Sequence, residues 1–253
     1  MPRSANDSRA FVDVGSTARR VAHVWSVEPE AFAEELTSRL SVLSAEERAR
    51  MGSFRFKRDR IAYAAAHVLV RVALSWCAPS VPPASWDLTQ SRNERPEVVT
   101  PKLSPRLRFN ISHTHGLVAC LVTSEIDCGI DVEVRRPMDD MEAVAARVLS
   151  PTEISALMAL PDHLRPHRFF CYWTLKEAYV KARGLGLSLP LEAVSFDLRA
   201  EGAVVTLGTS VDDYGPDWQF EQWSPTGHHI VAVAIRSGVI RDVRVVRHSQ
   251  MPV

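Results

Sequence analysis

The sequence predicts an α/β (α+β) fold made of two related halves, each a small, mostly antiparallel sheet packed with a long helix. The pattern V-L-S-x-x-E occurs at residues 42–47 and again at 148–153. A strand-like run precedes each copy, and a long helical stretch follows each copy. Because the flanking elements repeat together with the motif, we expect two similar halves, one at 1–124 and the other at 125–253.

The repeated motif is a signal for the start of a helix. Ser44 and Ser150 are expected to cap the helix, and Glu47 and Glu153, three residues later, to reach back to the backbone N–H of the cap. Pro151 follows the second serine at the first helical position, where a proline is tolerated. Each half is therefore expected to hold a short helix before its long one.

The remaining elements follow from hydrophobic periodicity. The long helices are expected at 58–77 and 168–183, and Gly184 ends the second one. The strand-like runs that precede the repeated motif lie at 21–27 and 127–133. Further strands are expected at 107–111, 117–122, 194–198, 203–207, 218–223 and 229–235.

The composition favours a soluble globular protein. The chain has 253 residues, 46% of them hydrophobic, and a net charge of zero, which argues against bulk nucleic-acid binding. Its most apolar stretch, 61–76, contains His67 and Arg71 and is too short and too polar to span a membrane. The four cysteines have no C-x-x-C spacing, so we expect reduced thiols and a cytoplasmic protein. Residues 1–18 and the last five residues are expected to be loose termini.

The distribution of lysine points to chemistry on the second long helix. The chain has 26 Arg and four Lys, and two of those lysines, Lys176 and Lys181, lie on this helix. Trp173, Glu177 and Lys181 are spaced four apart and therefore share one helical stripe. An ammonium group can exchange a proton near neutral pH, whereas a guanidinium cannot. The use of Lys in an Arg-rich chain therefore suggests a chemical requirement.

Three carboxylates form a candidate metal site. Asp131 and Glu133 alternate with apolar residues, so both point to one face of a strand, and Glu177 lies on the long helix. Each alone is compatible with a solvated acidic surface. Together they offer the oxygen-only ligands that suit Mg²⁺, which implies a phosphate-bearing substrate. The first half has no carboxylates at the corresponding positions, so one chemical site is expected.

Two further segments are candidates for anion binding. Ser112 and His113 stand at the end of a strand, where small donors can meet an anion, although the same residues also suit an ordinary hairpin turn. The stretch 48–60 is rich in Arg and is either a solvated face or a pocket for a terminal phosphate.

Taken together, these residues resemble the Sfp-type 4′-phosphopantetheinyl transferases. The family pattern N-x-S-H occurs at 110–113, G-I-D-[VI]-E at 129–133, W-[ST]-x-K-E-[AS]-[YF]-x-K at 173–181, and G-x-G-L at 184–187. The similarity runs in order from about 43 to 198. It implies a fold of two α/β halves with the site between them. It also implies transfer of the phosphopantetheine arm of coenzyme A to a serine of an apo acyl or peptidyl carrier protein.

The resemblance also implies roles for individual residues. Asp131, Glu133 and Glu177 would hold Mg²⁺ against the diphosphate of coenzyme A. Glu177 would take the proton of the carrier serine, directly or through a water. Lys181 would stabilise the bridging oxygen or protonate the departing 3′,5′-ADP, and Asp131 and His113 complete the catalytic set. The residues implied to contact coenzyme A are Arg50, Arg60, Arg95, Pro96, Ser112, His113, Lys176 and Lys181.

The chain departs from the family pattern at three positions. Glu47 and Ala62 stand where the family is commonly basic, and Glu94 stands where it usually has glycine in the turn beside the adenine. Substitutes for the missing positive charges are expected among Arg48, Arg58 and Arg60.

Two other functions stay open at this point. One is a non-catalytic relative that only binds coenzyme A or a carrier protein, for which the full set of acidic and basic residues would be unnecessary. The other is an unrelated Mg²⁺-dependent kinase or nucleotidase, which lacks support because the chain has no G-x-x-x-x-G-K-[ST] loop. The resemblance further implies a monomer of secondary metabolism, and the composition predicts that it binds neither nucleic acid nor a membrane. Its carriers are expected to be acidic near the serine and to dock on an apolar and basic surface near the cleft.

Overall fold

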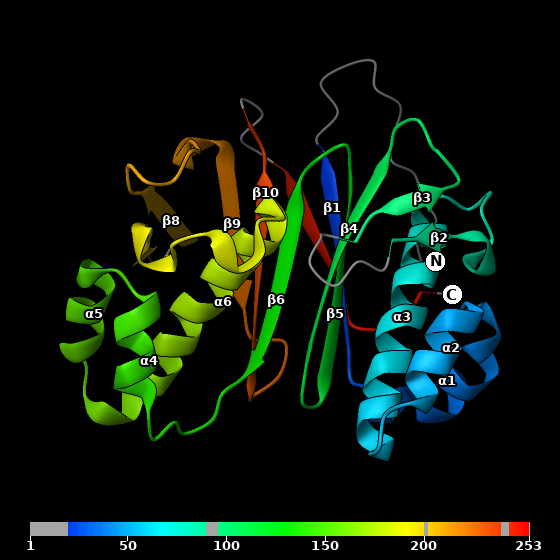
Figure 1. Cartoon of the computed structure of the whole chain (residues 1–253), viewed down its shortest axis with the longest axis horizontal. Helices are drawn as coiled ribbons and strands as arrows, with labels where there is room; N and C mark the ends of the chain where they lie inside the picture. The colour runs from blue at the N-terminus through cyan, green and yellow to red at the C-terminus, as the bar shows by residue number, and fades with distance from the viewer. Residues whose placement is uncertain (1–19, 90–95, 200–201, 239–242, 253) are drawn as a thin grey trace, which may run out of the picture.

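The computed structural model describes residues 20–89, 96–199, 202–238 and 243–252. Two small sheets lie side by side in the middle of the molecule, and helices cover their outer faces (Figure 1). The elements of the first half are β1 (Val21–Val27), α1 (Ala33–Arg39), α2 (Ala45–Gly52), α3 (Lys57–Cys77), β2 (Asp87–Leu88), β3 (Val98–Thr100), β4 (Leu107–Thr114) and β5 (Leu117–Ser124). The elements that follow are β6 (Cys128–Val134), α4 (Met141–Val148), α5 (Pro151–Met158), α6 (Arg165–Arg183), β7 (Val194–Arg199), β8 (Gly202–Leu207), β9 (Trp218–Trp223), β10 (His229–Arg236) and β11 (Arg244–His248).

The two halves repeat the same architecture. In the first sheet β5 lies between β1 and β4, and in the second β10 lies between β6 and β9, with antiparallel neighbours in each case. Each half also has a separate antiparallel pair, β2 with β3 and β7 with β8. The long helix α3 packs on the first sheet and α6 on the second (Figure 1). The predicted α/β fold of two related halves is therefore confirmed.

The halves pack against each other through the inner faces of their sheets. Val24, Leu121, Ile130 and Val233 belong to the apolar cluster that is buried between the sheets. Because successive residues of a strand point to opposite faces, Trp25 lies instead in the cluster around α3. For the same reason, the side chains of the odd-numbered residues of β6 point away from this apolar cluster and towards α6.

Helix α6 approaches β6 so closely that β6 needs a glycine at the contact. A Cβ atom added to Gly129 would lie 2.0 Å from the carbonyl oxygen of Ala178 and 2.5 Å from the nitrogen of Ala182. Both contacts are backbone atoms of a buried helix, so neither can move aside easily. The glycine of the G-I-D motif therefore sets the distance between the strand and the helix that carry the candidate site residues.

Both predicted capping boxes are present. In α2, Ser44 Oγ accepts the N–H of Glu47 at 3.1 Å, and Ser44 N–H donates to Glu47 Oε2 at 2.7 Å. In α5, Ser150 and Glu153 make the same two contacts at 3.2 and 2.7 Å. Gly184 ends α6 in the left-handed conformation, with φ at 67°.

Each capping glutamate is also half of a buried ion pair with the long helix. Arg71 Nε lies 2.9 Å from Glu47 Oε2, and Lys176 Nζ lies 2.7 Å from Glu153 Oε2. Both glutamates are 1% exposed. The two ion pairs hold the short and the long helix of each half together, and they are a further sign of the repeat.

The C-terminal segment departs from the predictions. β11, which has no predicted counterpart, pairs in parallel with β1 and so belongs to the sheet of the first half. Beyond it, Met251 is buried in the first-half core, and the backbone oxygen of Pro252 accepts a hydrogen bond from Arg39 at 2.9 Å. The prediction of a loose terminus over the last five residues is therefore wrong. The prediction for 1–18 lies outside the described residues.

The cysteines agree with the expectation of reduced thiols. All four cysteines lie in the described residues, are buried, and form no disulfide. Within the described ranges, no helix has the length and apolar character needed to cross a bilayer.

Replacing Gly129 with alanine should destabilise the protein by about 3 kcal/mol, because the new Cβ forces β6 and α6 apart. Urea unfolding measures this loss. Gly52→Ala is the matched control, since a Cβ there meets nothing within 4 Å and should change stability little. Equal stability of the two variants would contradict the close approach of strand and helix.

Lys176→Met should cost about 3–5 kcal/mol, because Glu153 would remain buried as an unpaired charge. The double variant Glu153→Gln/Lys176→Met should recover part of that loss, since glutamine carries no charge and its oxygen still accepts the N–H of Ser150, while the N–H of Phe196 loses its acceptor. Thermal unfolding of the three proteins tests this. A double variant no more stable than the single one would argue against the ion pair as the cause.

Candidate active site

A cavity of about 400 Å³ lies between the two halves. It brings together side chains from four elements. The lining residues are Tyr63, Ala66 and His67 from α3, Ile111, Ser112 and His113 from β4, Asp131, Val132 and Glu133 from β6, and Lys181 from α6. Five of the predicted site residues (Ser112, His113, Asp131, Glu133 and Lys181) therefore face one cavity.

The centre of the cavity wall is a cluster of three polar groups. Lys181 Nζ lies 2.6 Å from Asp131 Oδ1 and donates to Ser112 Oγ at 3.0 Å. Ser112 Oγ in turn donates to Asp131 Oδ1 at 3.0 Å. The other oxygen of Asp131, Oδ2, is buried and has no hydrogen-bond partner among the described residues. A buried carboxylate oxygen without a partner is costly, so this atom is a ready acceptor for a cation or a donor.

The N-x-S motif of β4 positions this cluster. Asn110 Oδ1 accepts the backbone N–H of Ile130 at 3.0 Å, and Ser112 Oγ accepts the backbone N–H of Val132 at 3.3 Å. The two acceptor residues are two positions apart on β4, and the two donor residues are two positions apart on β6, so each pair lies on one face of its strand. Because β4 and β6 are the edge strands of their sheets, the side chains of one satisfy the free backbone edge of the other.

Burial and mutual repulsion perturb the two glutamates. Burial, followed by the charge of Asp131, raises the pKa of Glu133, while the hydrogen bond from Trp173 Nε1 at 3.1 Å opposes this shift. Burial, again followed by Asp131, raises the pKa of Glu177, and Lys181 opposes that shift. Both glutamates therefore feel the charge of Asp131, and a cation would relieve the repulsion.

His113 stands at the mouth of the cavity. Its side chain is exposed, yet the surrounding protein removes enough water to lower its pKa, and the charges of Lys181 and His67 lower it further. Asp59 opposes this shift. Basic groups from α3, β4 and α6 thus surround one space, which favours an anionic ligand.

The three carboxylates do not form a preassembled metal centre. Within the ranges that the structure covers, no three His, Cys, Asp or Glu side chains lie close enough together to hold a metal ion. The chemistry of the group nevertheless fits a hard divalent cation, because its ligands are oxygens, Asp131 Oδ2 lacks a partner, and the pKa values of both glutamates are raised. Binding a cation would require side chains of the trio to reorient.

Lys176 does not belong to the cavity, which corrects the prediction that it contacts coenzyme A. Its side chain is completely buried, is paired with Glu153, and donates to the carbonyl oxygens of Leu191 and Val194. A step of one residue turns a helix by about 100°, so Lys176 faces the core of the second half although it adjoins Glu177.

Of the predicted basic contacts from the first half, the two that the structure describes, Arg50 and Arg60, do not line this cavity. Arg60 lines a separate, mostly apolar hollow of about 440 Å³ between α1 and α3, and donates to the carbonyl oxygen of Phe54 at 3.2 Å. Arg50 is exposed, with its guanidinium 5.3 Å from the ring of Phe54. Pro96 is described but does not line the cavity. Glu94 and Arg95 lie outside the described residues.

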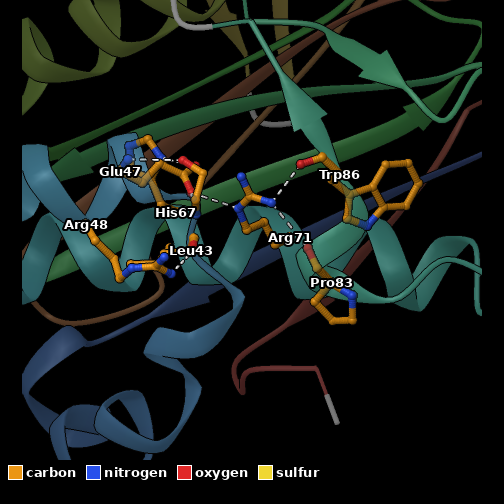
Figure 2. A network of polar contacts seen from close by, with 8 residues as sticks. Leu43, Glu47, Arg48, His67, Arg71, Pro83 and Trp86 are labelled. Atoms are coloured by element: carbon orange, nitrogen blue, oxygen red, sulfur yellow. Dashed lines mark hydrogen bonds and ion pairs between the residues drawn. The ribbon is translucent and has the colours of Figure 1, made fainter.

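The proposed substitutes at Arg48 and Arg58 also lie outside the lining. Arg48 donates to the carbonyl oxygen of Leu43 in the loop before α2, as Figure 2 shows. Arg58 is exposed and pairs with Asp59 at 3.4 Å.

Two lining residues, Tyr63 and His67, were not identified from the sequence. Their rings stack with centroids 4.1 Å apart, and His67 Nδ1 lies 3.0 Å from Glu47 Oε1. The available signal was a histidine and a tyrosine inside an otherwise apolar helical stretch.

The raised pKa of Glu177 has a consequence for stability. A carboxyl group whose pKa is higher in the folded protein favours folding at low pH and loses that contribution as the pH rises through the folded pKa. In metal-free buffer at pH 8, Glu177→Gln should therefore be more stable than the parent. The difference should close below about pH 4, where the carboxyl is neutral in both states.

Urea unfolding between pH 4 and pH 8 measures this difference. Glu142→Gln is the control, because that side chain is 70% exposed on α4, and it should give no such trend. A Glu177→Gln variant less stable than the parent at pH 8 would rule out the repulsive environment.

Comparison with known proteins identifies the family. Residues 25–125 match the model of the 4′-phosphopantetheinyl transferase N-terminal domain, and residues 127–234 match that of the 4′-phosphopantetheinyl transferase superfamily. The chain is 30% identical over 213 residues to 4′-phosphopantetheinyl transferase HetI of Nostoc sp., covering 84% of this chain and 86% of the relative. It is 34% identical over 171 residues to 4′-phosphopantetheinyl transferase Sfp of Bacillus subtilis, covering 68% of this chain and 73% of the relative. It is 27% identical over 211 residues to the L-aminoadipate-semialdehyde dehydrogenase-phosphopantetheinyl transferase of Mus musculus, covering 77% and 67%. The two halves of the fold, the cavity between them and these matches together show that the chain belongs to the 4′-phosphopantetheinyl transferase superfamily.

Proposed function

We propose that this protein transfers the 4′-phosphopantetheine arm of coenzyme A to a serine of an apo acyl or peptidyl carrier protein and releases 3′,5′-ADP. The observation that carries the proposal is the Lys181–Asp131–Ser112 cluster at the wall of a cavity between the two halves. It combines a fixed cation with a buried carboxylate that still has a free oxygen. Such a pair suits a site where a diphosphate is held and cleaved.

The reaction is a displacement at phosphorus. The serine oxygen of the carrier forms a bond to the phosphorus that bears the pantetheine arm, and the bond from that phosphorus to the bridging oxygen breaks. Glu177 takes the serine proton, directly or through a water, for which its raised pKa suits it. Lys181 stabilises the charge that develops on the bridging oxygen, and it has the proton that the departing 3′,5′-ADP can accept.

Asp131, Glu133 and Glu177 would together hold a divalent cation, for which Mg²⁺ is the best candidate. Such an ion neutralises charge on the diphosphate when bound. The oxygen-only ligand set, the unpartnered Asp131 Oδ2 and the raised pKa values of the glutamates support this part of the proposal. Ser112 keeps Asp131 and Lys181 in place, and His113 stands where it can contact a phosphate at the cavity mouth.

The proposal predicts a mass increase of one phosphopantetheine group on an apo carrier incubated with coenzyme A, Mg²⁺ and this protein. Mass spectrometry over a panel of fatty-acid, polyketide and nonribosomal-peptide carriers measures it, and a chelator should stop it. Glu177→Gln should lower the rate by a hundredfold or more, on the order of the loss of a preorganised charged group.

Glu142→Gln, which alters an exposed carboxylate on α4, is the control and should keep full activity. Undiminished transfer by the Glu177→Gln variant would remove Glu177 from the mechanism. Absence of transfer to every carrier of the panel would defeat the proposed function itself.

A further inference from the structure

In both capping glutamates, Glu47 and Glu153, the carboxylate oxygen Oε2 makes the same kind of contacts. Glu47 Oε2 accepts from the backbone of Ser44 at 2.7 Å and pairs with Arg71 at 2.9 Å, as Figure 2 shows for Arg71. Glu153 Oε2 accepts from its own serine at 2.7 Å and pairs with Lys176 at 2.7 Å. Each half thus uses the same contacts to cap its short helix and to link it to the long helix.

The glutamates differ at their other oxygen. Glu153 Oε1 accepts the backbone N–H of Phe196 at 2.9 Å. Glu47 Oε1 instead contacts Nδ1 of His67 at 3.0 Å. The fold can therefore satisfy this oxygen with backbone alone, and the first half uses a side chain from the cavity wall in its place.

This contact determines what His67 presents to the cavity. The pKa of Glu47 is lowered to about 2 by its hydrogen bonds to His67, Ser44 and Arg71, which outweigh the opposing effect of burial, so its carboxylate accepts only. Nδ1 of His67 must then carry the hydrogen of this bond, and Nε2 is the nitrogen that is left to contact a ligand in the cavity. The side chain is 31% exposed and its ring is held by stacking on Tyr63, so the ring is fixed but open to the cavity.

The surroundings of His67 favour an anion at Nε2. The titratable and charged groups around it are Glu47 from α2, Tyr63 and Arg71 from α3, and His113 from β4. Asp131 and Glu133 of β6 line the same cavity, and there Lys181 of α6 pairs with Asp131. The charge of His67 contributes to the lowered pKa of His113, so the two rings repel each other across the cavity when charged. A phosphate bound between the two rings would attract both of them and offset this repulsion.

We propose that Glu47 is a positioning residue that holds His67 so that His67 Nε2 donates a hydrogen bond to a phosphate oxygen of coenzyme A. This inference rests on the proposed function. When both ring nitrogens carry a hydrogen, Nδ1 donates to Glu47 and Nε2 donates to the phosphate. His67 thereby supplies the substitute positive charge that was expected among Arg48, Arg58 and Arg60, none of which lines this cavity.

Two variants separate the ligand contact from the contact with Glu47. In His67→Asn the amide nitrogen replaces Nδ1 and keeps the bond to Glu47, while the nitrogen that faces the cavity is lost. In His67→Gln the longer side chain replaces Nε2 and keeps a donor in the cavity. His163→Asn, at an exposed histidine near the start of α6, is the matched control.

The expected result is a split between binding and chemistry. By isothermal titration and by KM, His67→Asn should weaken coenzyme A binding about tenfold or more, the loss of one charge-assisted hydrogen bond. Its kcat, its KM for the carrier and its thermal stability should stay close to those of the parent. His67→Gln keeps a donor in the cavity but has neither the charge nor the contact with Glu47, so it should recover only part of the binding that His67→Asn loses, and the control should bind coenzyme A as the parent does. Glu47→Gln should weaken binding in the parent but add nothing in the His67→Asn background.

The use of 3′-dephospho-coenzyme A identifies the phosphate. An effect of His67→Asn that disappears with this analogue places the contact at the 3′-phosphate, and an effect that persists places it at the diphosphate. A folded His67→Asn variant that binds both compounds as the parent does would overturn the inference. So would an unchanged ¹⁵N resonance of His67 Nε2 when coenzyme A is added to the parent, a measurement that needs no variant. Failure of the parent to modify any carrier, by contrast, would count against the proposed function.

Discussion

The two sheets meet along their edge strands through side chains rather than through a continued ladder. Asn110 and Ser112 of β4 accept the backbone N–H groups of β6, and Ser112 also contacts the acidic and basic groups of the cavity wall. Together with the apolar layer between the sheets, this strand thereby fixes the relative position of the halves, and it also orients Asp131 and Lys181. A change in the packing of the halves would change the chemistry of the cavity, because the same atoms serve both.

The repeated architecture supports an asymmetric site. Both halves keep the capping box, the buried ion pair and the long helix on the outer face of a three-stranded unit. Among the residues that line the cavity, β6 contributes the carboxylates Asp131 and Glu133 and α6 contributes Lys181, while α3 and β4 contribute histidines and a tyrosine to the facing wall. The second half thus offers groups for a cation and proton transfer, and the first half offers groups for an anion. A cavity between two such walls suits a ligand that carries several negative charges near a bound cation.

The sequence was informative where the signal is local. Capping boxes, the alternation in β6 and the C-terminal ends of the long helices depend on residues close together in the chain, and they were predicted correctly, whereas α6 begins three residues before its predicted start at 168. β11 was missed because its partner β1 lies at the other end of the chain, and no local pattern reveals a parallel pairing of that kind. Lys176 was misplaced because neighbours in a motif face different sides of a helix. The pairing of His67 with Glu47 depends on how α2 packs on α3, so the sequence could offer only the presence of a histidine in an apolar stretch.

The position of β11 also matters for how the chain folds as it is made. β1 pairs on one side with β5, and its other edge pairs with β11, which ends at His248. The ribosome therefore releases almost the whole described chain before that edge can be covered. Until then a nascent first half exposes the open hydrogen-bonding edge of β1, the kind of template that invites pairing with other chains. Completion of the first sheet is consequently a late event in the synthesis of the described chain, even though most of its strands emerge early.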